Sequence, residues 1–148
     1  EPYHKSADEL FGPKVIDAFP NAAFDIQEAG RCQAFELWTA SVMHIMRVLE
    51  IGLQGLADHV CVEHQENWNK TLNLIEVKLR EVRRKVDGSE AEQWAAETGT
   101  HLRFVKNAWR NQAMHPQAVY DEARAKGIFD NAKSFMNQLA EKIDPHQL

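Results

Sequence analysis

The sequence is poor in cysteine and has no long apolar run. Its two cysteines, Cys32 and Cys61, are too few for a disulfide framework, so free thiols are the expected state. No stretch of eighteen apolar residues occurs, and no cationic leader precedes an apolar segment. Neither a membrane span nor a signal peptide is therefore expected, and we predict a soluble cytoplasmic protein.

Positive charge is also scarce. The net charge of −5 argues against a protein coated in positive potential for non-specific nucleic-acid binding. A polyanionic partner must therefore be met by a local basic patch. A hydrophobic fraction of 44% excludes a disordered tail, and 148 residues suit a single domain.

Proline placement is the most informative feature for the fold. None of the five prolines falls between residues 21 and 115, and period-2 alternation typical of strands appears nowhere. Apolar periodicity predicts helices over about 22–35, 42–60, 68–85, 90–114 and 120–143. We therefore predict an all-α chain, an antiparallel bundle of about five helices. Residues 1–20 contain three prolines and are expected to be an extended or partly ordered lead-in to one domain of residues 21–148.

The second predicted helix carries the clearest buried stripe. Its apolar residues are spaced by four and three, at Val42, Met46, Leu49, Leu53, Leu56 and Val60. Gly52 and Gly55 interrupt this helix, and glycine there costs about 1 kcal/mol relative to alanine. We expect a neighbouring helix to approach closely at these glycines. In the third helix, the inward positions are expected to be Ile75, Leu79, Val82 and Val86.

Two weaker patterns have simple structural explanations. His59, Cys61 and His64 lie close together, but residues two apart on a helix point to different sides and no second ligand pair exists, so no metal site is expected. The basic run Lys78–Lys85 is interpreted as a solvated face interleaved with glutamates. The alternative for this run is a patch that contacts phosphates.

One segment has the residue types of a functional site, the sequence WRNQAMHP from Trp109 to Pro116. An arginine followed five residues later by a histidine is weak evidence alone, and the asparagine directly after Arg110 makes the pattern more specific. Because Pro116 disfavours the α conformation of the preceding residue, the helix should end just before His115. His115 could then turn back toward Arg110 and Asn111.

A basic stripe leads to this histidine along the same helix. Arg103, Lys106 and Arg110 recur at i, i+3 and i+7, beside Asn107 and Asn111. Such a stripe could contact RNA phosphates. The alternative is a solvated face that ends in an ordinary helix-terminal histidine.

The arginine, polar residue and histidine at the end of the fourth helix resemble the motif of the HEPN superfamily of helical bundles. The segment TASVMHIMRVLEIGL adds to the resemblance, because its Arg47 and Glu50 are similar to polar positions of that family's second helix. The resemblance covers about residues 22–143. It implies a homodimeric, metal-independent endoribonuclease without a cofactor, of a toxin–antitoxin or phage-defence kind, with an antitoxin protein as a further partner.

The same resemblance assigns roles to individual residues. Arg110 and His115 would be catalytic, and Asn111 would assist. Glu50 either orients His115 or Arg110, or only pairs with Arg47 three residues earlier. Some relatives carry a tyrosine two residues after the histidine, which a partner nucleotidyltransferase modifies; here Gln117 stands there and Tyr120 lies further on. The alternative function is a non-catalytic module that binds nucleotide, RNA or protein, and a third is a purely structural bundle.

Overall fold

All regular secondary structure in the described part of the chain is helical. The computed structural model describes residues 5–84 and 89–143, except for the side chains of residues 83, 84 and 89. Its long helices are α3 (Ala23–Ala34), α4 (Trp38–His59), α5 (Trp68–Arg84), α6 (Ser89–Met114) and α7 (Glu122–Ala140). The all-α prediction is confirmed, and each of these helices lies close to its predicted range. No helix in these ranges is long and apolar enough to cross a membrane.

The N-terminal segment differs from the expected extended lead-in. It forms two short helices, α1 (Ala7–Phe11) and α2 (Pro13–Ala18), which raise the number of described α-helices to seven, and the 3₁₀ turn η2 (Pro20–Ala22). Pro13 and Pro20 stand at the first positions of α2 and η2, where proline is compatible with a helix because no intrahelical N–H bond is lost. Phe11 and Val15 are buried in the same apolar cluster as the later helices, so the core begins before residue 21.

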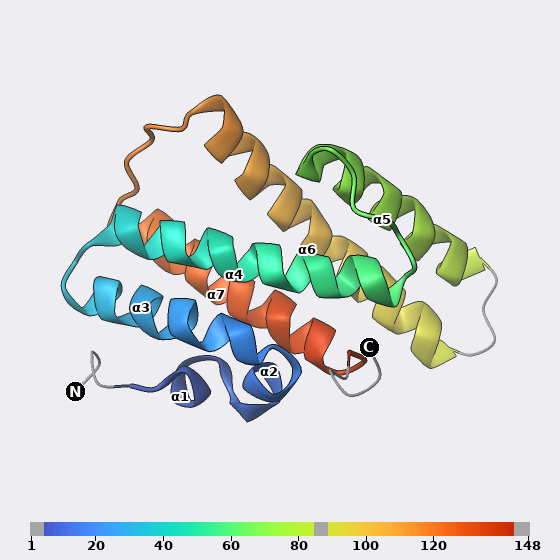
Figure 1. Ribbon diagram of the computed structural model, residues 1–148, viewed down its shortest axis with the longest axis horizontal. Coiled ribbons are helices and arrows are strands. Elements are labelled where there is room, and N and C mark those ends of the chain that lie inside the picture. Colours follow the sequence, from blue (N-terminus) through green and yellow to red (C-terminus); the bar gives the residue numbers. More distant parts are fainter. Residues whose placement is uncertain (1–4, 85–88, 144–148) are drawn as a thin grey trace.

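Helix α4 crosses the middle of the molecule and packs chiefly on α3 and α7 (Figure 1). Helix α6 packs on α7, and α5 packs mainly on α6. The pairs α3/α4, α5/α6 and α6/α7 each run in opposite directions, whereas the chain after α4 doubles back before α5 begins (Figure 1). Helix α5 therefore runs in the same direction as α4, unlike in a simple up-and-down order, and its antiparallel pairing with α6 places its start beside the C-terminal half of α6 (Figure 1).

The turn after α4 is made without glycine. Cys61 adopts a left-handed backbone with φ +60°, and the Val62 N–H donates to the Ala57 carbonyl at 2.8 Å. This is the hydrogen bond of a Schellman motif, which satisfies carbonyls at the end of the helix. Val62 is buried, so an apolar contact holds the reversed chain against the core.

The stripe predicted on α4 forms the centre of the core. Val42, Met46, Leu49, Leu53 and Leu56 are all buried. The close approach of a neighbouring helix is confirmed at Gly52, where a Cβ would lie 2.5 Å from Met136 Sδ of α7. At Gly55 the neighbour is not a helix: a Cβ there would lie 2.8 Å from Cε1 of Phe19, which lies between α2 and η2.

One inward residue was predicted wrongly on α5. Ile75 and Leu79 are buried, but Val82 is exposed, and Val86 lies outside the described residues. Because α5 packs mainly on α6 alone, its buried face is narrower than that of a helix with neighbours on two sides.

The close approach of α4 and α7 gives a test of the fold. Gly52→Ala should lower the free energy of unfolding by about 1–3 kcal/mol, because the added methyl overpacks the contact with Met136. The matched control is Gly99→Ala in α6, where a Cβ meets nothing within 4 Å. That change should raise stability by up to about 1 kcal/mol through helix propensity. Urea unfolding measures both, and equal effects would contradict the packing described.

Candidate functional site

The C-terminal end of α6 carries the predicted motif, and the helix ends where Pro116 requires. Met114 is its last residue, as predicted. The His115 N–H still donates to the Asn111 carbonyl at 2.9 Å, and the His115 carbonyl then accepts from the Ala118 N–H at 2.9 Å. The imidazole of His115 and the guanidinium of Arg110 are exposed, and neither forms a hydrogen bond or ion pair with another described residue. The two predicted catalytic side chains therefore share one exposed helix end without contacting each other.

Asn111 has a different environment from Arg110, although the two are adjacent in sequence. Its Nδ2 donates to the Tyr120 hydroxyl at 3.2 Å, and that hydroxyl donates to Gln112 Oε1 at 2.9 Å. The backbone N–H of the buried Tyr120 donates to Thr39 Oγ1 at 3.0 Å, which ties the loop to α4. Asn111 thus faces a hollow between α6 and α7 and holds the loop that carries His115. The structure does not join its amide to Arg110 or His115.

A groove between α5 and α6 opens beside the motif. Its lining includes Trp68 and Leu72 of α5, Trp109, Arg110 and Met114 of α6, and Pro116, and its volume is about 730 Å³. We call it the α5–α6 groove. His115 lies between two of its lining residues in sequence. The ring centroids of Trp68 and Trp109 are 6.3 Å apart, and His64 packs on Trp68 with centroids at 6.2 Å. The predicted motif therefore adjoins an aromatic cavity.

The predicted basic stripe lies along one side of α6. Arg103, Lys106, Asn107 and Arg110 line a common hollow of about 260 Å³ together with Glu76 of α5. Lys106 Nζ is 2.7 Å from Glu76 Oε2, so one positive charge of the stripe is neutralised. This hydrogen bond is the main cause that lowers the pKa of Glu76 from its ordinary value. Arg103 and Arg110 form no ion pair with a described residue and leave the stripe locally basic.

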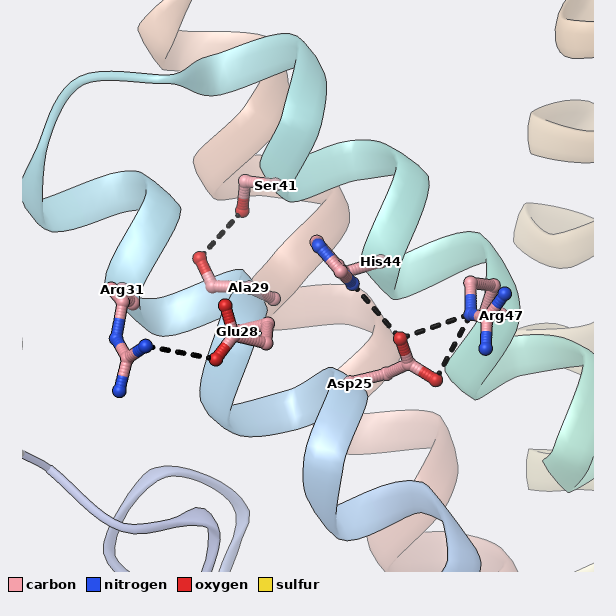
Figure 2. A network of polar contacts seen from close by, with 7 residues as sticks. All are labelled: Asp25, Glu28, Ala29, Arg31, Ser41, His44 and Arg47. Atoms are coloured by element: carbon pink, nitrogen blue, oxygen red, sulfur yellow. Dashed lines mark hydrogen bonds and ion pairs between the residues drawn. The ribbon is translucent and has the colours of Figure 1, made fainter.

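The two residues of α4 that were expected to support the site, Arg47 and Glu50, form no hydrogen bond or ion pair with the motif. Arg47 Nε donates to both carboxylate oxygens of Asp25 on α3, at 3.0 and 3.1 Å, and His44 Nδ1 lies 2.9 Å from Asp25 Oδ1 (Figure 2). Glu50 forms no hydrogen bond or ion pair with another described residue, so neither alternative for it, a contact with His115 or Arg110 or a pair with Arg47, is seen, and Arg47 pairs with Asp25 instead. Arg47 pairs with Asp25 because the Asp25 side chain is only 5% exposed, and a charge this deeply buried requires an opposite charge beside it.

The basic run on α5 is only partly described. Lys78 pairs with Glu81 at 3.7 Å and Arg80 pairs with Glu76 at 3.4 Å, both within the helix. These pairs favour the interpretation of a solvated face for this part of the run. The side chains of Arg83 and Arg84, and all of Lys85, lie outside the described residues. Among the described residues, no group of three or more His, Cys, Asp or Glu is placed to hold a metal ion.

Three residues that shape this end of the molecule were missed by the sequence reasoning. Asp25 stood on the buried face of its helix, three residues after Ala22 and four before Ala29, and this spacing could have marked it as a paired carboxylate. Trp68 and Tyr120 gave no comparable signal, since their importance depends on the packing of α5 against α6 and on the loop after α6.

Comparisons with known proteins add no relative to these observations. No family model matches the chain, and neither the curated proteins nor the solved structures give a significant match. The function is therefore inferred from the site itself.

The Tyr120 hydroxyl gives a test of how the motif is held. Tyr120→Phe should lower the free energy of unfolding by about 1–3 kcal/mol, because Asn111 and Gln112 lose their partner in a half-buried place. A double-mutant cycle with Asn111→Ala supplies the control. We expect a coupling energy of at least about 0.5 kcal/mol from urea unfolding, and strict additivity would contradict the hydrogen bond.

The ion pair between Glu76 and Lys106 predicts a pH dependence of stability. Because the pKa of Glu76 is lowered on folding, the carboxylate stabilises the protein above its ordinary pKa of 4.5, and this contribution is lost as the pH falls through the lower value. Glu76→Gln should therefore be less stable than the wild type at neutral pH, and the difference should shrink as the pH falls below 4.5. Glu81→Gln, whose ion pair is longer at 3.7 Å, serves as the matched control with little expected effect. A pH-independent difference for Glu76→Gln would contradict the assignment.

Proposed function

We propose that the protein is a HEPN-type, metal-independent endoribonuclease. One observation carries the proposal: Arg110 and His115 are both exposed at the end of α6, free of hydrogen bonds and ion pairs with other described residues, beside a groove large enough for part of a ligand. Support also comes from the exposed Arg103, which extends positive charge along the approach to the groove.

The proposed reaction is the attack of an RNA 2′-hydroxyl on its own phosphodiester. The 2′-oxygen forms a bond to phosphorus while the bond to the 5′-oxygen breaks, which gives a 2′,3′-cyclic phosphate and a 5′-hydroxyl. A base takes the proton of the 2′-hydroxyl, and an acid protonates the leaving oxygen. The imidazole of His115 would make one of these transfers, and Arg110 offers a planar fork that stabilises charge on the phosphate oxygens.

Asn111 is assigned a positioning role in this proposal. Its amide bonds to Tyr120, so it acts by holding the segment that carries His115. Arg103, Lys106 and Asn107 would contact RNA phosphates along the stripe, with Lys106 shared with Glu76.

The proposal includes a homodimer in which two motifs face a shared cleft. Two proton transfers are needed, and each motif supplies a single histidine. Met114 is 67% exposed and Val119 is 82% exposed, on either side of His115 in sequence. Apolar side chains this exposed favour a protein contact, either with a second copy or with an antitoxin. A cytoplasmic toxin–antitoxin or phage-defence role follows from the same proposal.

The alternative is a non-catalytic HEPN-like module that binds nucleotide, RNA or a protein partner. The apolar character of the α5–α6 groove favours it, since such a groove binds ligands whether or not His115 takes part in chemistry.

The two functions are separated by one assay. Wild-type protein should cleave mixed RNA in EDTA and leave 2′,3′-cyclic phosphate ends, whereas His115→Ala should lose at least about 100-fold in rate, because a general acid or base contributes that much. His59→Gln is the control, because His59 lies at the C-terminal end of α4, where it packs on Trp94 and not on the motif. Equal inactivity of wild type and His115→Ala, with retained RNA binding, would leave the non-catalytic module as the function.

A further inference from the structure

The α5–α6 groove contains aromatic side chains that the proposed cleavage does not use. Trp68 and Trp109 line it from two helices, with a centroid distance of 6.3 Å and an interplanar angle of 40°. This is the distance of two aromatic side chains in direct contact, so the tryptophans form one aromatic surface beside the groove. A planar ring can stack on such a surface.

A polar group of the groove points to the kind of ring. The amide of Asn69 lines the groove and forms no hydrogen bond with another described residue. A nucleobase brings a π-face for the tryptophan surface together with keto and ring-nitrogen acceptors for this amide, so it matches the groove better than a purely apolar group does.

Charge in the groove favours a nucleotide over an apolar peptide. Arg110 lines the groove and forms no ion pair with a described residue, while Lys106 is held by Glu76. Stacking on aromatic faces beside a free arginine is the arrangement by which proteins hold single-stranded nucleic acid. Arg110 also lines the adjoining hollow with Arg103, so the positive charge continues beyond the groove.

We propose that the α5–α6 groove is a subsite for one unpaired nucleobase of single-stranded RNA, which stacks on the aromatic surface of Trp68 and Trp109 while Arg110 binds the adjoining phosphodiester. The assignment rests on the proposed function for RNA as the ligand. It adds that the substrate must be unpaired at this position, because a base within a duplex cannot enter the groove.

Binding to a cleavage-deficient protein tests the subsite. His115→Ala is titrated in EDTA with a fluorescently labelled single-stranded RNA and with the same RNA annealed to its complement, and anisotropy and tryptophan fluorescence are recorded. We expect the single strand to bind more tightly and to quench tryptophan emission. Trp68→Leu in this background should weaken single-strand binding by about 5- to 100-fold, the range for loss of one stacked base.

The matched control is Trp38→Phe, since Trp38 lies on α4 against Lys126, outside the groove. It should change binding less than about twofold. Trp68→Phe keeps a ring and should show an intermediate loss, which provides a measurement if Trp68→Leu does not fold. Equal affinity for single and double strands, or equal binding by the Trp68 and Trp38 variants, would overturn the subsite.

Failure of the subsite can be told apart from failure of the proposed function. If wild type does not cleave RNA but Trp68→Leu still impairs single-strand binding, the subsite stands and the nuclease fails. If wild type cleaves RNA and the Trp68 variants bind and cleave as wild type does, the nuclease stands and the subsite fails.

Discussion

The packing of α4 against α3 and α7 is the contact on which the rest of the structure depends. Gly52 lets Met136 of α7 approach the backbone of α4, and the buried stripe of α4 fills the space that remains. A buried carboxylate, Asp25, holds the other side of α4 through His44 and Arg47 (Figure 2). Since α7 also supports α6, the position of the motif at the end of α6 follows indirectly from this central helix.

The candidate site illustrates how neighbouring residues of one helix are divided between structure and function. Arg110 and Asn111 are about 100° apart around α6, because the helix has 3.6 residues per turn. Asn111 consequently meets Tyr120 on the side facing α7, while Arg110 reaches the groove on the side facing α5. A rigid, hydrogen-bonded inner side can hold the loop of His115 in place while the outer side remains available to a ligand.

Helix α5 gives the site its second wall through its antiparallel pairing with α6 (Figure 1). This pairing places Trp68, at the start of α5, beside Trp109, near the end of α6. The left-handed Cys61 and the buried Val62 turn the chain back before α5, so that α5 runs in the same direction as α4. The proposed base subsite therefore depends on the contact between α5 and α6.

The sequence by itself determined the helical class, the ranges of the five long helices, the stripe on α4 and the end of α6 before His115. These features depend on local periodicity and on the restriction that Pro116 imposes on its neighbour. Tertiary structure alone decided that residues 7–22 join the core, that Arg47 pairs with Asp25, that Asn111 bonds to Tyr120 and that two tryptophans meet beside Arg110. Each of these depends on which face of one helix meets another, and that choice is made by packing between segments distant in the chain.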